Sequence, residues 1–413
     1  MSSKRINDLY VWTQIKGEPV IAGKFNNTDR VGTFFYANSY IEREDSYALD
    51  PVNLPLIKEK EFHTKANGGY FGVFTDAGPD RWGQKVLSEL SPSKPRSPLE
   101  FLLAGNGDGC GALLFSLSRT SVKKPNIIGN SNDIGILEEA AQDILHDESI
   151  NPSVQKMIVE RSSMGGARPK ASVVIGNEHY MAKFNRDEDL FNEAIAESAS
   201  LKMAKDAGIL VCDSKVTFNS STGHEVFLTK RFDFNEDGTK KHYISANSLM
   251  NMYKVQENNP DQGYPGLAAI ARKICSNPED ASKEVFRRMC FRILTGDTDD
   301  HAKNYGFLYN EATKKFEHSP FFDVLPHANI IGNQAMTVGS YGRQSSLKNM
   351  LSMCESFGLS KAEAGNIIKE QVSVIKNWRD YYREEGMKEK EVQILESCFH
   401  IFDSKEKVFG LNL

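Results

Sequence analysis

One stretch constrains this chain more than any other: Gly296-Asp-Thr-Asp-Asp-His-Ala-Lys-Asn-Tyr-Gly306. A further acid, Asp323, follows Asn304 by 19 residues, in Ser-Pro-Phe-Phe-Asp-Val-Leu. An Asp (Asp299), an Asn five residues later (Asn304) and a distant Asp (Asp323) are spaced as phosphoryl transfer requires. In that chemistry the first acid accepts a hydroxyl proton, and the Asn and the last Asp hold Mg²⁺ against the phosphates. An acidic turn that caps a helix would use the same residue types, so a purely structural role for this stretch stays open at this point.

Composition restricts the class of protein. The chain has 413 residues, of which 40% are hydrophobic and 25% charged, which is typical of a globular protein of two or three domains. A net charge of −5 makes unaided binding to nucleic acid unfavourable, because such binding needs a basic face. The six cysteines are dispersed without a CxxC pair, which favours free thiols in a reducing compartment over zinc ligands. The first residues do not resemble a signal peptide and no apolar run approaches 18 residues, so we expect a cytoplasmic protein with no membrane contact.

The first 120 residues have the pattern of a β-rich region. Segments 9–15, 20–25 and 31–36 are rich in β-branched and aromatic residues, and the turn signal Gly17-Glu-Pro separates the first two. Helices are expected to begin after Asp80 and at Pro98, before a glycine-rich loop. That loop is not a dinucleotide fingerprint, because no strand precedes it and no helix follows.

A possible phosphate loop opens the next region. Its sequence is Ser162-Ser-Met-Gly-Gly-Ala-Arg-Pro-Lys170, and it leads into expected strands at 171–175 and 180–184. The paired glycines would let backbone N–H groups approach an anion, although an ordinary Gly-Gly turn has the same composition. Lys183 lies in the second expected strand. It could be a solvated edge residue or a lysine that reaches nucleotide phosphates.

The remaining pattern changes from strands to helices. A helix is expected from Asn192 to Gly208, followed by strands at 211–216 and 225–234, the second of which would end at a hinge between two lobes. The backbone near 229–231 could meet a purine edge there, and Asp233 could either reach a ribose hydroxyl or form a turn. Amphipathic helices follow at 265–274 and 281–294, and 346–409 is expected to be helical.

Taken together, these motifs resemble the HipA family of bacterial serine/threonine kinases, the toxin components of HipBA-type toxin–antitoxin modules. The resemblance extends over nearly the whole chain. It rests on motifs that begin at Phe71, Gly107, Ser163, Leu228, Asp299 and Phe322. It implies an α+β fold that is bilobed and protein-kinase-like, with a β-rich N-terminal subdomain and an all-helical C-terminal lobe. The expected divisions are 1–130, the N-terminal subdomain; 131–235, the kinase N-lobe with phosphate loop and hinge; and 236–413, the C-lobe with the catalytic and metal motifs.

The resemblance also implies roles for particular residues. Asp299 would be the catalytic base, Asn304 and Asp323 the Mg²⁺ ligands, and Lys303 a cation that neutralises the migrating phosphoryl group. Ser163 matches the loop serine that the family autophosphorylates, and Arg168-Pro169 departs from the Gln-Glu of the best-known members. ATP would be bound by residues of the phosphate loop, the lysine strand and the hinge: Ser163, Gly165, Gly166, Ala167, Lys170, Lys183, Lys230, Phe232 and Asp233.

The expected function is transfer of the ATP γ-phosphoryl group to a serine or threonine hydroxyl. By resemblance the substrate would be an aminoacyl-tRNA synthetase, whose phosphorylation arrests translation. The partner would be a helix-turn-helix antitoxin of the HipB type, through which DNA is mainly contacted. Two other classes stay open: a non-catalytic corepressor or interaction protein, and a small-molecule kinase that uses the same Asp, Asn and Asp.

Overall fold

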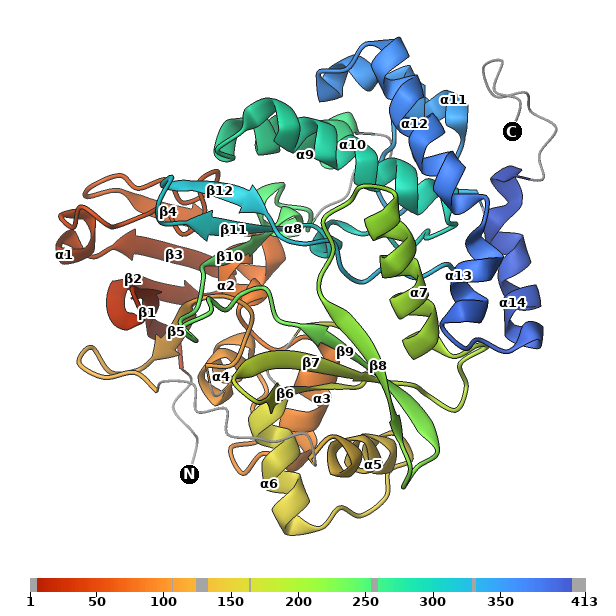
Figure 1. Cartoon of the computed structure of the whole chain (residues 1–413). Helices are drawn as coiled ribbons and strands as arrows, with labels where there is room; N and C mark the ends of the chain where they lie inside the picture. The colour runs from red at the N-terminus through yellow and green to blue at the C-terminus, as the bar shows by residue number, and fades with distance from the viewer. Residues whose placement is uncertain are drawn as a thin grey trace. The chain divides into compact units, whose positions relative to one another are not determined.

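The computed structural model describes residues 6–105, 107–123, 133–162, 165–253, 259–328 and 332–402 of the chain. It divides into two compact units, each described by itself (Figure 1). The first comprises Met1–Arg186, Thr217–Tyr253 and Phe307–Lys314, and the second Asp187–Val216, Lys254–Gly306 and Lys315–Leu413. Among the described residues no helix is both long and apolar enough to cross a membrane.

An antiparallel five-stranded sheet, in the order β4-β3-β2-β1-β5, begins the first unit. The expected turn at Gly17 joins β1 to β2, and both Lys16 and Gly17 have positive φ, as two-residue hairpin turns favour. The three N-terminal strands predicted from sequence are therefore confirmed. The strands are β1 (Asp8–Ile15), β2 (Glu18–Thr28), β3 (Val31–Tyr36), β4 (Glu61–Thr64) and β5 (Leu113–Ser116). The accompanying helices are α1 (Asn38–Ile41), α2 (Gly72–Asp76), α3 (Arg81–Leu90) and α4 (Pro98–Ala104).

A second sheet, of four strands in the order β6-β7-β9-β8, lies in the first unit except for the first three residues of β8. Helices α3, α5 and α6 pack against it around one hydrophobic core, which includes Trp82, Leu137, Ile158 and Val173. Burial of these aliphatic and aromatic side chains is what fixes the helices on the sheet. The elements are α5 (Asp133–Leu145), α6 (Pro152–Arg161), β6 (Lys170–Ile175), β7 (Glu178–Phe184), β8 (Ser214–Asn219), β9 (His224–Lys230), β10 (Tyr243–Ser245) and α8 (Ala246–Leu249).

Helices dominate the second unit, but the expectation that 236–413 is all-helical was wrong, because β10, β11 and β12 form a three-stranded sheet within that range. The predicted apolar stripe of α10 is confirmed, since Val285, Phe286, Met289, Cys290, Ile293 and Leu294 are all fully buried. Asn277 caps this helix and Pro278 occupies its first position, which explains why it begins before the predicted start. The elements are α7 (Glu193–Asp206), α9 (Tyr264–Ile274), α10 (Pro278–Leu294), β11 (Gly306–Asn310, mostly in the first unit), β12 (Lys315–His318), α11 (Leu347–Ser352), α12 (Lys361–Ile375), α13 (Trp378–Glu384) and α14 (Glu389–Leu395).

Some elements differ from the sequence expectation. The strand expected at 211–216 is β8, which starts at Ser214, and the strand expected to run to 234 ends at Lys230. The next residue, Arg231, still donates its backbone N–H to the carbonyl of His179 over 2.8 Å, and its side chain enters a buried ion cluster. Helix α6, helix α2 and strand β4 are short or weakly periodic segments that the pattern did not indicate. The three-part domain division stays a prediction.

Candidate active site

The C-terminal end of α10 positions the acidic loop. Thr295 is the C-cap of this helix, and the N–H of Asp297 donates to the carbonyl of Arg292 while that of Gly296 donates to the carbonyl of Ile293. This pair of bonds is the Schellman arrangement, which needs a left-handed residue after the helix; Gly296 has φ of 67°. A Cβ on Gly296 would also lie 2.3 Å from the carbonyl oxygen of Cys398. The glycine therefore sets the direction in which the loop leaves the helix.

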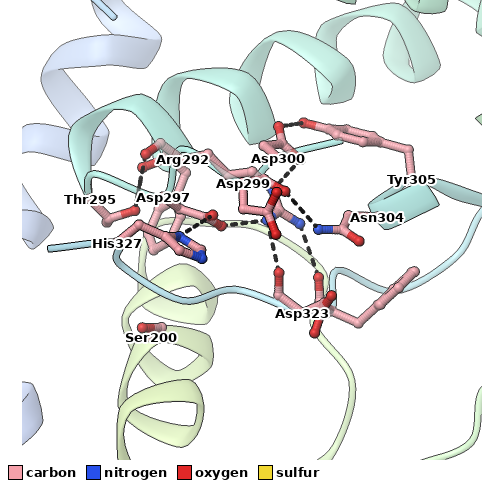
Figure 2. A network of polar contacts seen from close by, with 12 residues as sticks. Ser200, Arg292, Thr295, Asp297, Asp299, Asp300, Asn304, Tyr305, Asp323 and His327 are labelled. Carbon is pink, nitrogen blue, oxygen red and sulfur yellow. Dashed lines mark hydrogen bonds and ion pairs between the residues drawn. The ribbon is translucent and has the colours of Figure 1, made fainter. Parts of the chain in front are cut away.

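Asp299, Asn304 and Asp323 lie close to one another in the second unit (Figure 2). Asp299 is exposed, Asp323 is half-buried and Asn304 is 6% exposed. The side-chain amide of Asn304 donates to the backbone carbonyl of Asp299 over 3.5 Å. The backbone N–H of Asn304 donates to the carbonyl of His301 over 2.9 Å. Asp323 has a φ of 55°, a left-handed conformation that is unfavourable for a residue with a Cβ. The three residues that the spacing singled out thus share one site.

Arg292 joins the two loops that carry these residues. Its guanidinium is fully buried on the last turn of α10 and donates to the carbonyls of Asp323 and Phe322 over 2.9 and 3.0 Å. On the other side it forms a short ion pair with Asp297 and a 3.0 Å ion pair with Asp300. A guanidinium has its donors in a rigid fork, so it fixes the loop at 297–300 relative to the backbone of Asp323.

Asp300 lies behind the site rather than in it. Its carboxylate is fully buried and accepts hydrogen bonds from the hydroxyls of Tyr264 and Tyr305, the latter over 3.2 Å. Burial, together with the neighbouring Asp297 carboxylate, raises the pKa of Asp300 to about 7, although Arg292 and the tyrosine hydroxyls lower it. This acid therefore supports the loop and leaves the adjacent Asp299 as the exposed carboxylate.

His327 is the second basic partner of Asp297. The imidazole Nδ1 of His327 lies 3.5 Å from Asp297 Oδ1. The backbone N–H of His327 donates to the carbonyl of Gly296 over 3.0 Å. Burial lowers the pKa of His327, but the hydrogen bond to Asp297 and the charges of Asp297, Asp299 and Glu193 raise it more, so the net shift is upward.

The phosphate-loop residues and Lys183 belong to the first unit. Lys170 begins β6, where it faces Lys183 across the β6–β7 ladder, and its ammonium donates to the carbonyl of Gly165 over 2.9 Å. Lys183 is 9% exposed, with its ammonium 5.8 Å from the centre of the Phe227 ring. It is thus a buried strand lysine rather than a solvated edge residue. Gly165 and Ala167 are exposed and Gly166 is half-buried, whereas Ser163 lies outside the described residues.

The predicted hinge contains a buried ion cluster centred on Arg231. Its guanidinium bonds to Asp233 over 2.8 and 3.0 Å and forms a short ion pair with Asp108. Asp233 also accepts from the N–H of Gly111 over 2.8 Å and lies 3.6 Å from Lys240. Burial raises the pKa of Asp233, but Arg231 and Lys240 lower it more, so this carboxylate is strongly acidic.

Other predicted residues have different surroundings. Lys230 pairs with Glu178 at the end of β9, and the Phe232 ring lies 5.8 Å from that of Tyr243. Lys303 is exposed in the catalytic loop. Asp233 is 1% exposed with both carboxylate oxygens bonded, so a ribose contact, which stays a prediction, would require this cluster to open.

The donor set suits a hard cation. An Asn oxygen and an Asp carboxylate are oxygen ligands of the kind Mg²⁺ takes when substrate phosphates supply the rest of its coordination. Among the described residues no group of three His, Cys, Asp or Glu side chains could hold a metal, and a two-ligand Mg²⁺ site does not need one. Asn304 and Asp323 therefore fit the expected ion.

Sequence reasoning missed the supporting residues Arg292, Asp300, Arg231, Asp108 and Lys240. One signal was available for Arg292. It sits beside the apolar stripe of α10, where a charged residue must be paired when it is buried.

Comparisons with known proteins agree with the resemblance. The family model described as the HipA-like C-terminal domain matches residues 162–378, or 217 of the 413 residues, and that of the HipA N-terminal domain matches residues 13–116. A Haemophilus influenzae protein named "Putative kinase" is 26% identical over 203 residues, which cover 44% of this chain. The match spans 58% of that relative's length.

Solved structures match over longer stretches. HipA of Shewanella oneidensis, in a complex with HipB and its operator DNA, aligns with a TM-score of 0.66 and 16% identity, covering 98% of this chain and 100% of the other. The proinflammatory kinase CtkA of Helicobacter pylori aligns with a TM-score of 0.45 and 16% identity, covering 60% of this chain and 94% of the other. The predicted α+β fold is confirmed, and with both family models matched in order along the sequence, this chain belongs to the HipA family.

Proposed function

We propose that this chain is a HipA-type toxin that transfers the γ-phosphoryl group of ATP to a serine or threonine of a protein. The observation that carries the proposal is the placing of Asp299, Asn304 and Asp323 together on two loops held by one buried arginine. Two loops fixed in this way give the positioning on which phosphoryl transfer depends.

In this proposal each residue of the loops has one task. Asp299, the exposed carboxylate, accepts the proton of the attacking hydroxyl. Asn304 and Asp323 hold Mg²⁺, which when bound neutralises charge on the phosphates. Lys303, exposed in the same loop, adds positive charge near the transferred group.

The first unit supplies the nucleotide contacts in the same proposal. Lys183 reaches the phosphates, and the loop of Gly165, Gly166, Ala167 and Lys170 surrounds them with backbone N–H groups. Lys230 and Phe232 belong to the hinge that receives the purine, and Asp233 shapes that hinge or contacts the ribose. Ser163 is the proposed site of autophosphorylation.

Substrate and partner follow from the family. We propose an aminoacyl-tRNA synthetase as the substrate and a HipB-type helix-turn-helix protein as the partner. The partner proposal is supported by the Shewanella HipA structure, which contains HipB and operator DNA. DNA would be contacted mainly through the antitoxin, because this chain carries a net charge of −5.

The decisive experiment is peptide mass spectrometry of the full chain after incubation with Mg²⁺ and ATP. We expect phosphate on Ser163 in the wild type and none in Asp299→Asn or Asp323→Asn, while the exposed-acid control Glu311→Gln behaves as wild type. The wild type must first be shown to lack phosphate from expression. Nucleotide turnover with phosphate on a small molecule but never on protein would overturn the protein-kinase assignment.

A further inference from the structure

Donors from several elements hold the carbonyls of the phosphate loop, among them the N–H of Phe184, which bonds to the Pro169 carbonyl over 3.0 Å. Within the described part of the loop, 165–170, Lys170 donates to Gly165 and Arg186 donates to Ala167, the latter over 3.2 Å. The backbone N–H of Trp82 donates to the Gly166 carbonyl over 3.2 Å, and its indole Nε1 donates to the Lys170 carbonyl over 2.9 Å. Trp82 therefore contacts both the middle and the end of the loop.

Gly83 contacts Ser162, the first residue of the loop. A Cβ built on Gly83 would lie 2.1 Å from the carbonyl oxygen of Ser162, which is closer than two non-bonded atoms can approach. Because the opposing atom is backbone, an added methyl group would have to displace the chain at Ser162. The first turn of α3 thus fits against the loop only because this position lacks a side chain.

Helix α3 is a firm support for these contacts. Trp82 is 3% exposed and Val86 fully buried, and both belong to the hydrophobic core shared with α5, α6 and the four-stranded sheet. Asp80 caps the helix by accepting from the Arg81 N–H over 2.9 Å. The motif Gly78-Pro-Asp-Arg-Trp-Gly83, although it belongs to the predicted N-terminal subdomain, is therefore anchored in the core beneath the loop.

The bonded carbonyls also orient the N–H groups of the loop. In a trans peptide the C=O and N–H point in opposite directions. Donors that hold the carbonyls of Gly165, Gly166 and Ala167 therefore turn the N–H groups of the following residues away from those donors. The direction of these N–H groups matters because backbone N–H groups that converge on one point can bind an anionic phosphate.

We propose that the first turn of α3, through Trp82 and Gly83, docks the phosphate loop and sets its affinity for nucleotide. These two are positioning residues, since they act through the backbone of the loop. The inference rests on the proposed function, because it takes ATP as the ligand of the loop. It gives the Pro-Asp-Arg-Trp-Gly motif a role in nucleotide binding rather than in folding alone.

The test compares Trp82→Phe and Gly83→Ala with a control on the same helix, Ser88→Ala, whose side chain is exposed. The probe is the Mg²⁺ complex of a non-hydrolysable ATP analogue, titrated calorimetrically into the full chain, with thermal unfolding recorded for each variant. Loss of one hydrogen bond predicts a rise in Kd of roughly three- to tenfold for Trp82→Phe. Gly83→Ala should raise Kd further because it moves backbone, and Ser88→Ala should leave Kd unchanged.

Kinetics separate docking from general damage. If phosphorylation is measurable, both variants should raise KM for ATP while kcat at saturating ATP changes less than twofold. Hydrogen exchange of the peptide covering 165–170 should speed up in both variants while exchange in α10 does not change, whereas a general loss of stability would speed up exchange in both segments. A folded Gly83→Ala protein with wild-type Kd and unchanged loop exchange would overturn the docking role. A wild type that binds no nucleotide would instead overturn the proposed function, while the exchange result would still test the docking.

Discussion

The predicted hinge, around Arg231, and the predicted catalytic loop, around Arg292, contain the same motif, one buried arginine between two aspartates, but they balance its charge differently. At the hinge Arg231 pairs with Asp108 and Asp233, and the buried ammonium of Lys240 adds a second positive charge. At the catalytic loop Arg292 pairs with Asp297 and Asp300, and the second basic partner is His327, a partly exposed imidazole. The hinge cluster is neutral with two cations and two anions, whereas the catalytic cluster has an excess negative charge unless a proton binds.

The pKa values follow this difference. Burial favours the neutral form of Asp233, but two neighbouring cations hold its pKa well below the ordinary range. Burial also favours the neutral form of Asp300, and with one full cation and a second carboxylate beside it, its pKa rises to about 7. Asp233 should therefore stay ionised across the working pH range, although burial and Arg231 lower the pKa of Lys240. The cluster at Arg292 instead exchanges a proton near neutrality through Asp300.

Removing each arginine should give the largest effect. Arg292→Met leaves two buried carboxylates with no full cation, and we expect a loss of about 3–5 kcal/mol in the free energy of unfolding. Arg231→Met leaves Lys240 near Asp233, so its loss should be smaller by about 1 kcal/mol or more. Urea unfolding at pH 8 measures both values. Equal losses would show that the charge balance does not distinguish the clusters.

The pH dependence of stability should come from the catalytic cluster. Because the pKa of Asp300 is raised from 3.8 to about 7, the folded state binds a proton more tightly than the unfolded state between those values. Stability then falls as pH rises through this window, by at most about 1.4 kcal/mol per pH unit. Asp300→Asn, which keeps an acceptor for Tyr264 and Tyr305, should flatten the curve between pH 5 and 7.

A matched substitution at the hinge provides the control. Asp233→Asn removes a carboxylate that titrates well below pH 5, so it should lower stability without changing the slope between pH 5 and 7. A slope that is the same in the wild type and in Asp300→Asn would assign the titration to another group.

Removing the second cation should make the hinge resemble the catalytic loop. Lys240→Met leaves Arg231 with two buried carboxylates, and we expect a loss of about 1–2 kcal/mol at pH 8. It should also create a new pH dependence, with stability recovering as the pH is lowered and one carboxylate binds a proton. Unfolding curves at pH 6 and pH 8 measure this; a loss that is identical at both values would contradict the charge argument.

The same contrast explains what sequence could and could not predict. Apolar periodicity and turn residues predicted β1, β2, β3 and α10, because burial and backbone sterics act locally. The proximity of Asp299, Asn304 and Asp323 followed from a spacing tied to one chemistry. The partners of Arg231 and Arg292 could not be predicted in this way, since Asp108 lies 123 residues from Arg231 and only folding brings them together.

The sequence pattern also could not assign a role to residues that fit several roles. Asp233 fits a ribose contact, a turn or an ion cluster equally well in sequence, and only its surroundings show that both of its oxygens are bonded. The same holds for Trp82, an aromatic residue near a helix start, whose contacts with the phosphate loop depend on the packing of α3 against β6.

The smallest effect is expected at His327, and its sign is opposite to that of an ordinary salt-bridged carboxylate. The pKa of His327 is raised above 6.5, mainly by Asp297 acting against burial, so its contribution to stability is complete below the unfolded value. That contribution is lost as pH rises through the folded value. His327→Gln should therefore lower the free energy of unfolding by less than about 1 kcal/mol at pH 5.5, because 32% of the side chain is exposed. At pH 9 the substitution should have no measurable effect on the free energy of unfolding.

Thermal unfolding at these two pH values provides the measurement, with Asp297→Asn as the matched change on the other side of the pair. If His327 supplies the missing charge of the catalytic cluster, then Asp297→Asn should make His327→Gln neutral at pH 5.5, a coupling that a double-mutant cycle detects. A cost for His327→Gln that is equal at both pH values would instead assign the residue to packing and to its backbone bond with Gly296. In that case Asp300 alone would account for proton uptake at the catalytic loop, and the contrast with the hinge would depend on a single buried acid.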